Sequence, residues 1–101
     1  MIDFTKIVGF DWDAGNERKS VDKHRVSQSE AEQVFVNSPV VITLDIKHSQ
    51  DETRLQALGK TNEGRLLHVS FTMREGGTRI RVISARDMHR KERSDYEEAS
   101  S

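Results

Sequence analysis

The chain has 101 residues, of which 34% are hydrophobic and 33% are charged, and its formal net charge is −1. This length supports one domain with a single modest core. The chain contains no cysteine, which excludes disulfides, thiolate nucleophiles and cysteine-ligated zinc. No apolar run approaches the roughly 20 residues of a membrane span, and the first residues lack a signal-peptide pattern, so we expect a cytoplasmic protein without a membrane partner.

The charges are distributed unevenly along the chain. Residues 54–93 hold 10 basic and 4 acidic residues, whereas residues 1–53 hold 6 basic and 10 acidic residues. A basic block on a nearly neutral protein is typical of a phosphate-binding face.

The first half of the chain predicts a strand followed by two helices. Residues 8–13 alternate apolar and acidic side chains, as a short strand does, with Trp12 in the core. Residues 15–24 are mostly charged helix formers and predict a half-solvated surface helix. Residues 27–30 read Ser-Gln-Ser-Glu, a capping box that begins a second helix, and Ser38-Pro39 ends it.

The second half predicts four strands and a last helix. Residues 40–46 alternate as a half-buried strand, with Leu44 and Ile46 on its apolar face, and residues 54–60 form the next strand. Residues 65–86 then form a β-hairpin around Gly76-Gly77. Asp87 caps a final helix over residues 88–98. The order predicts an α+β fold in two layers, with the N-terminal helices packed on an antiparallel sheet and a C-terminal helix.

The hairpin register separates an apolar face from a cationic one. With Gly76 and Gly77 as a two-residue loop, Arg74 faces Arg79, and Leu67, Val69, Phe71 and Met73 share the core side with Ile80 and Val82. Like charges that face each other destabilise a strand pair, so a bound anion would explain the arginines. Alternatively, both guanidinium groups extend into water or a carboxylate such as Glu75 neutralises them.

An ordered set of short motifs resembles the BrnT family of ribonuclease toxins from bacterial type II toxin-antitoxin systems. The motifs are Phe10-Asp-Trp-Asp13, Lys23-His24, Val26-Ser27, Glu30-Ala31, Val34-Phe35, Arg54, Leu58-Gly59, Gly64-Arg65-Leu-Leu, Thr72-Met-Arg74, Arg81-Val-Ile-Ser-Ala-Arg86, Glu92-Arg93 and Tyr96. The resemblance covers about residues 9–98, leaves 99–101 as a tail, and implies a RelE-like fold.

The chain departs from the family pattern at a few positions near its first and last helices. Asn16, Ser20, Arg25 and Met88-His89 stand where family members tend to have Lys, Asn, Gly and Ala-Thr. Arg25 follows a predicted helix end, where glycine accepts the left-handed conformation, so a side chain there costs about 1 kcal/mol. These departures leave open a weakened or inactive toxin.

The resemblance implies metal-independent RNA cleavage that blocks translation. It also implies neutralisation by a BrnA-like DNA-binding antitoxin, assembly into a heterotetramer of two toxins and two antitoxins, and contact with operator DNA only through the antitoxin. No cofactor is implied, and His68 and His89 lack partners at metal-ligand spacing, so no metal site is predicted.

RNA cleavage without a metal needs a proton-transfer group and cations that stabilise the phosphorane. We expect His24, beside Lys23, to transfer the proton, because imidazole titrates near neutrality; the alternative is that it complements a helix dipole. The predicted phosphate clamp consists of Arg54, Arg65, Arg74 and Arg86, because the guanidinium fork matches phosphate.

Other side chains receive secondary roles. Arg79 and Arg81 are expected to contact flanking phosphates, although a solvated or paired charge is an equal alternative for any single arginine. Glu52 is expected to pair with Arg54, or else to act as a base. Tyr96 would stack on an RNA base or, alternatively, anchor the last helix by packing.

Two functions without catalysis remain open. The first is a non-catalytic RNA-binding or partner-binding domain on the same scaffold, and the second is a structural interaction domain. An assay with RNA distinguishes the three functions. Cleavage indicates the ribonuclease, binding without cleavage indicates the non-catalytic binding domain, and absence of RNA binding at low salt indicates the structural interaction domain.

Overall fold

The sheet lies at the centre of the molecule. The structure is a computed structural model that describes residues 4–13, 21, 23–50 and 52–100. Its five strands lie in the order β1-β5-β4-β3-β2. They span Gly9–Asp11 (β1), Val41–Leu44 (β2), Leu55–Lys60 (β3), Leu66–Arg74 (β4) and Arg79–Asp87 (β5). The helices are α2 at Gln28–Val36 and α3 at Arg90–Ser100, with 3-10 turns η1 at Phe4–Lys6, η2 at Ile46–His48 and η3 at Glu75–Gly77. Within these ranges no helix is long and apolar enough to cross a membrane.

The predicted α+β class is confirmed, but the sheet is mixed rather than wholly antiparallel. Strands β3, β4 and β5 form the predicted antiparallel meander, and β2 pairs antiparallel with β3. At the edge, β1 pairs with β5 in parallel, with Phe10 opposite Ile80. Alternation identifies a strand without indicating its partner, and β1 and β5 are joined by most of the chain rather than by a hairpin turn.

The β4–β5 register is as predicted, and the turn is longer. Phe71 pairs with Val82 and Arg74 with Arg79, so residues 75–78 rather than two glycines form the connection. Glu75, Gly76 and Gly77 all have positive φ. A bulge between Ser70 and Phe71 shifts the register further along the pair.

Helix α2 covers the apolar face of the sheet. It begins with the predicted capping box, in which the Ser27 hydroxyl accepts from Glu30 N and the Glu30 carboxylate accepts from Ser27 N, both at 3.1 Å. The Phe35 ring meets Phe71 edge-on at 5.0 Å. Trp12 packs against this core, as predicted, and its Nε1 donates to Glu32.

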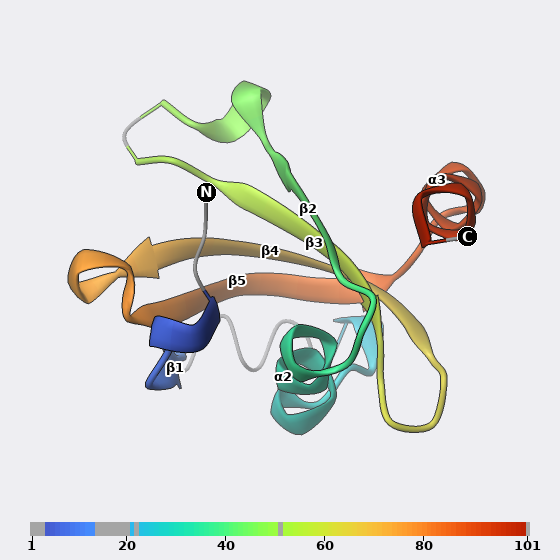
Figure 1. The fold of residues 1–101 in the computed structure, drawn as a ribbon, viewed down its shortest axis with the longest axis horizontal. Helices are drawn as coiled ribbons and strands as arrows, with labels where there is room; N and C mark the ends of the chain where they lie inside the picture. The colour runs from blue at the N-terminus through green and yellow to red at the C-terminus, as the bar shows by residue number, and fades with distance from the viewer. Residues whose placement is uncertain (1–3, 14–20, 22, 51, 101) are drawn as a thin grey trace.

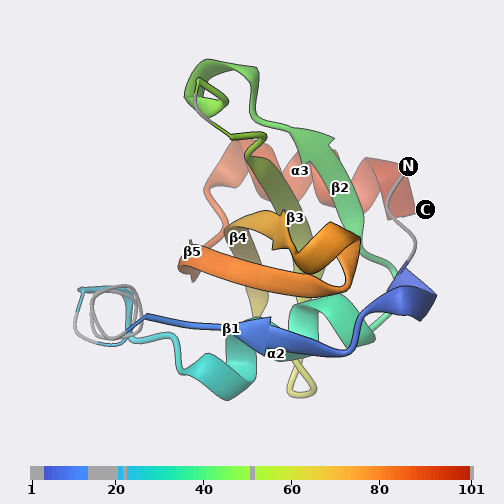
Figure 2. The same ribbon diagram turned by 90° about the vertical axis from the view of Figure 1, so that its left-hand side faces the viewer.

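Helix α3 lies against the other face. Alternation along β4 places His68 on the side opposite Leu67, and the His68 Nε2 is 3.8 Å from the Glu92 carboxylate of α3. Figures 1 and 2 show α2 and α3 on different sides of the meander. Asp87 does not cap α3, because its carboxylate binds Arg65; instead, Glu92 accepts from His89 N at 2.9 Å.

Two predictions fall outside this agreement. The predicted helix over residues 15–24 lies outside the described residues except for Val21, Lys23 and His24, which are helical. Leu44 and Ile46 were expected on the core face, yet they are 53% and 79% exposed. Leu44 ends the edge strand β2 and Ile46 begins η2, whereas Asp45 between them is buried.

Candidate active site

The predicted site residues occupy two ends of the sheet rather than one site. Arg65 precedes β4 and Arg74 ends it, and nine strand residues separate these ends by about 25 Å. In Figure 1 the loop between β2 and β3 and the η3 turn lie toward the left, whereas α3 lies at the right. Arg54 and Arg74 share the first end, and Lys23, His24, Arg65 and Arg86 belong to the other.

A basic hollow of about 600 Å³ lies at the first end. Its lining combines three cationic side chains with an imidazole, an amide and a carboxylate: Lys47, Arg54, Arg74, His48, Gln50 and Glu52. Five of these residues come from the loop between β2 and β3, and Arg74 comes from the end of β4. The hollow therefore depends on the antiparallel pairing that brings β3 beside β4.

The loop is shaped by hydrogen bonds at its base. Asp45 N donates to Arg54 O at 2.8 Å, which continues the β2–β3 ladder by one pair. The Ser49 hydroxyl donates to Asp45 O at 2.6 Å and accepts from Arg54 N at 2.9 Å. These bonds fix residues 45–49 beside Arg54.

Arg74 has both an occupied and an unoccupied donor. One terminal nitrogen, Nη2, donates to Glu52 at 3.0 Å, in a pair whose side chains are 40% and 42% exposed. The Arg74 Nε is buried and has no acceptor among the described residues. Glu52 thus pairs with Arg74, and the predicted Glu52–Arg54 pair does not form, because the strand pairing brings Arg74 to the loop.

His48 forms a dyad with Asp45 at the edge of this hollow. The His48 Nδ1 lies 2.9 and 3.1 Å from the two Asp45 carboxylate oxygens. The His48 side chain is 54% exposed, whereas that of Asp45 is only 9% exposed. Burial acts to raise the pKa of Asp45, but hydrogen bonds from Gln56 and His48 outweigh it, so the pKa lies below its ordinary value.

At the other end, Arg65 is enclosed by the protein's own acceptors. It donates to both Asp87 oxygens at 2.7 and 3.1 Å and to Glu30 at 3.2 Å. It also donates to the main-chain oxygens of Arg25 and His24, at 2.8 and 3.2 Å. The Asp87 hydrogen bond raises the Arg65 pKa, and the Arg65 hydrogen bond lowers that of Asp87. Arg65 therefore fastens residues 24–25 to the sheet.

The same part of the structure shows the expected strain at Arg25. Its φ is 55°, in the left-handed region, and its N–H donates to Val21 O at 3.0 Å. The prediction of a left-handed residue after the first helix is confirmed.

Arg86 attaches α3 to the sheet. Its two terminal nitrogens donate to the two Glu92 oxygens at 2.7 and 2.9 Å. This pair lowers the pKa of Glu92 to about 2. Burial is the main cause that lowers the pKa of His68 beside them, and the Arg86 charge adds to it. These contacts hold α3 in place.

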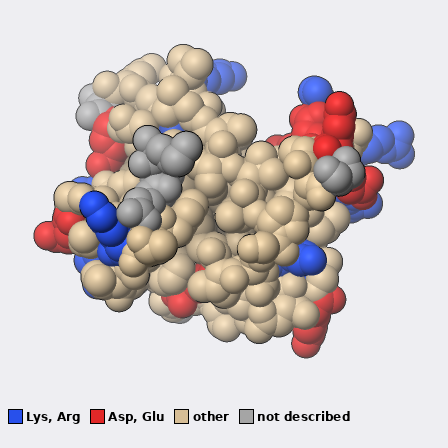
Figure 3. Space-filling view, in the orientation of Figure 1, with Lys and Arg blue, Asp and Glu red and all other residues tan. Residues whose placement is uncertain are grey.

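Arg79 and Arg81 pair with the carboxylates of the first strand segment. Arg79 Nε donates to Asp11 at 2.6 Å, and Arg81 Nη2 donates to Asp13 at 2.8 Å. The alternative that carboxylates neutralise the facing arginines is thus realised, by Asp11 and Glu52 rather than by Glu75. In Figure 3 the uncharged surface fills the centre of the view, and charges of both signs lie at its rim.

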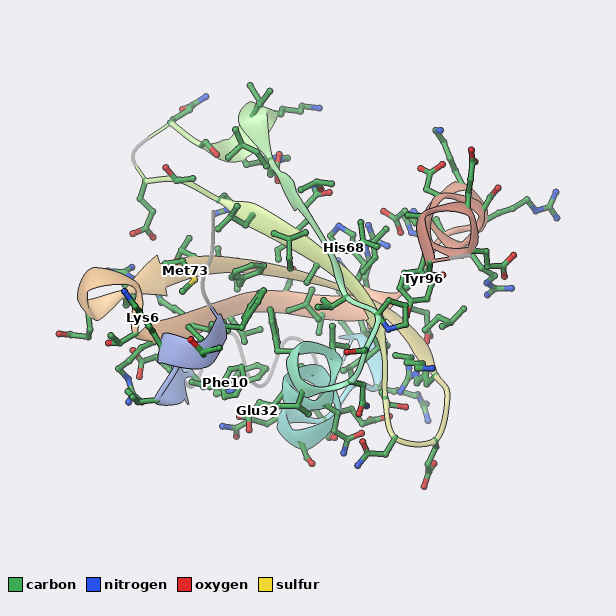
Figure 4. The ribbon with its side chains drawn as sticks, in the orientation of Figure 1. Lys6, Phe10, Glu32, His68, Met73 and Tyr96 are labelled. Carbon is green, nitrogen blue, oxygen red and sulfur yellow. The ribbon has the colours of Figure 1, made fainter. Side chains whose placement is uncertain are left out.

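Tyr96 is a packing anchor. Its ring is 5% exposed, and its hydroxyl donates to Pro39 O at 2.7 Å, which joins α3 to the segment before β2. Burial raises the pKa of its hydroxyl. Figure 4 shows Tyr96 between α3 and the sheet. The packing alternative holds in place of the stacking role.

The sequence reasoning missed three lining residues of the basic hollow, Lys47, His48 and Gln50. It also missed Asp45, which holds the His48 ring. The signal was the spacing of Asp45 and His48, three residues apart and close to Glu52 and Arg54 in the chain. That spacing gains meaning only when β3 and β4 bring Arg74 to the same place.

The comparisons with known proteins agree with the fold. A model of the family described as "Ribonuclease toxin, BrnT, of type II toxin-antitoxin system" matches residues 12–92. The crystal structure of the Brucella abortus ribonuclease toxin BrnT superposes with a TM-score of 0.59 at 23% identity, covering 81% of this chain and 97% of that chain. No curated protein sequence matches significantly. Because the family match extends over most of the sequence, this chain belongs to the BrnT family of ribonuclease toxins of type II toxin-antitoxin systems.

Proposed function

We propose that this chain is an endoribonuclease toxin that cleaves RNA without a metal ion and thereby inhibits translation. Membership of the ribonuclease toxin family supports the activity at the level of reaction class. The proposal places the scissile phosphate in the basic hollow and includes a RelE-like scaffold beneath it.

The observation that carries the proposal is the convergence of Lys47, Arg54 and Arg74 on one open hollow. Guanidinium groups remain charged at all working pH values and donate in a fork that fits phosphate oxygens. Arg74 offers an unpaired Nε beside a surface-exposed pair with Glu52, and exposed pairs contribute little to stability. A phosphate can therefore replace Glu52 at small cost.

Incubation of the purified protein with single-stranded RNA in EDTA tests this function. We expect cleavage by the wild type and a loss of at least about tenfold in kcat/KM for Arg74→Ala, because a charged hydrogen bond to the phosphate disappears. Arg90→Ala removes an exposed positive charge from α3, outside the hollow, and serves as the matched control. Intact RNA with the wild type, together with normal growth on expression, contradicts the proposal.

The antitoxin part of the proposal follows from the family. A BrnA-like antitoxin neutralises this toxin in the cytoplasm, assembles with it as a heterotetramer and provides the contact with operator DNA. Addition of that antitoxin to the cleavage assay should stop the reaction, and the mass of the complex should correspond to two copies of each chain. A different mass contradicts the assembly alone.

A non-catalytic RNA-binding domain is the second candidate. It is favoured because ion pairs within the chain occupy arginines that the sequence-based prediction assigned to RNA phosphates. Five of the predicted RNA-contacting arginines pair with carboxylates of the same chain: Arg65, Arg74, Arg79, Arg81 and Arg86. RNA binding that weakens steeply with salt, without any cleaved product, would support this function instead.

A further inference from the structure

We propose that His48 is the general base of RNA cleavage and that Asp45 is the residue that positions it. The proposal rests on the proposed function, since it assigns a role within the same hollow. It differs from the sequence-based expectation, in which His24 transfers the proton.

The geometry of the dyad defines which nitrogen of His48 is available. Both Asp45 carboxylate oxygens accept from His48 Nδ1, at 2.9 and 3.1 Å. This favours the His48 tautomer that carries its proton on Nδ1. The Nε2 atom then bears the lone pair, and no hydrogen-bond partner of Nε2 is found among the residues that the structure describes. Asp45 is held in turn, because its main-chain N–H donates to Arg54 O and its side chain accepts from Gln56.

The charges around His48 suit a reaction at phosphate. Lys47, Arg54 and Arg74 supply positive charge in the same hollow, and Glu52 is the one acidic side chain among its described lining residues. Nearby positive charge stabilises the developing phosphorane. Asp45 acts on His48 through orientation, because its carboxylate holds the ring by Nδ1.

The other three histidines lie outside the lining of this hollow. His68 is 5% exposed beneath α3, and its Nδ1 is buried without a partner in the described part of the chain. His89 is exposed at the start of α3. His24 supplies a main-chain oxygen to Arg65, at the opposite end of β4 from Arg74.

The reaction follows from these positions. The His48 Nε2 takes the proton of a ribose 2′-hydroxyl, and the 2′-oxygen forms a bond to the adjacent phosphorus. The bond between phosphorus and the 5′-oxygen breaks, and its electron pair leaves with that oxygen, which takes a proton from water. His48 returns its proton to the resulting hydroxide. The products are a 2′,3′-cyclic phosphate and a free 5′-hydroxyl, with no net oxidation or reduction.

The experiment compares histidine variants on one short single-stranded RNA. We expect His48→Gln to lower kcat by about 100-fold or more, the usual contribution of a general base, while RNA affinity stays within about threefold. Glutamine can still donate to Asp45, so it protects the fold, and thermal unfolding verifies this. His89→Ala is the control for loss of an exposed imidazole, and His24→Ala tests the competing assignment. Free imidazole should partly restore cleavage by His48→Ala.

Asp45→Asn separates positioning from structure. It should lower kcat with little change in KM. In a comparison of kcat against pH, the midpoint of the acidic limb should differ between Asp45→Asn and the wild type, since the orienting charge is lost. A merely structural role for Asp45 would leave that midpoint unchanged. The charged groups around His48 that bear on this pH profile are Asp45, Lys47, Glu52, Arg54 and Arg74.

The outcomes are distinct. If the wild type cleaves RNA and folded His48→Gln cleaves at the same rate, or if only His24→Ala is inactive, the assignment of His48 is wrong and the proposed function stands. If the wild type does not cleave at all, both fail. If RNA methylated at the 2′-oxygen of the scissile nucleotide is still cut there, the 2′-hydroxyl mechanism is overturned.

Discussion

Arg65 gives the sharpest distinction between a structural arginine and an RNA-binding one. Arg65→Ala removes the fork that binds both oxygens of Asp87, together with the bonds to Glu30 and to two main-chain oxygens. The Arg65 side chain is only 29% exposed, but Asp87 is 61% exposed and is rehydrated when its partner is lost. Allowing for that screening, we expect a loss of about 3 kcal/mol in the free energy of unfolding and a Tm lower by about 12 °C.

The pH dependence provides a second measurement of the same contacts. The Arg65 hydrogen bond lowers the pKa of Asp87, while for Glu30 the largest lowering comes from the Ser27 main chain, with Arg65 adding to it. Both folded-state pKa values lie below the unfolded ones, so this stabilisation is complete above about pH 5 and is lost as the pH falls through the folded values. The difference between wild type and Arg65→Ala should therefore shrink in acid.

Urea unfolding at several pH values measures both effects, with Arg90→Ala as the charge control and Arg65→Lys as the variant that keeps the charge without the fork. Cleavage by Arg65→Ala well below its Tm should remain close to that of the wild type. An Arg65→Ala protein of unchanged stability but with much weaker RNA binding would refute this reasoning and restore Arg65 to the phosphate clamp.

Three further substitutions test other parts of the structure. Arg25→Gly should raise the free energy of unfolding by about 0.5–1 kcal/mol in a urea titration, because it relieves a left-handed φ of 55°, whereas Arg25→Ala should give no such gain. Glu92→Gln should lower the free energy of unfolding by about 2 kcal/mol near neutral pH and by almost nothing near pH 2. The reason is that the Glu92 pKa is about 2, so its pairing with Arg86 is lost as the pH falls to that value. An undiminished difference in acid would contradict this. Gly59→Ala should lower the Tm, because a Cβ there would lie 2.7 Å from Val34 Cγ1 and 3.1 Å from Val34 O. An unchanged Tm would show that α2 can move away.

Local patterns in the sequence predicted local structure well. The capping box at Ser27 and Glu30 and the pairing of Arg74 with Arg79 each depend on residues that are neighbours in the chain, so spacing alone determines them. The left-handed conformation of Arg25 was predictable because the resemblance places a glycine at this position after a predicted helix end.

The site was harder to predict because ion pairs form between distant segments. Arg79 meets Asp11 only because β1 joins the sheet beside β5, and Arg74 meets Glu52 only because β3 lies beside β4. A list of arginines in the sequence contains neither fact. Counting the residues of β4 would have shown that Arg65 and Arg74 stand at opposite ends of one strand.

The parallel pairing of β1 with β5 has a consequence for how the chain folds. Gly9 meets Arg79, so about 70 residues lie in the loop that this contact closes, which costs about 4 kcal/mol of chain entropy. The meander can assemble from sequential hairpins with far smaller loops, so we expect this edge to form late. Until β1 docks, the outer hydrogen-bonding groups of β5 remain unpaired, and an unpaired edge of this kind can pair with another chain.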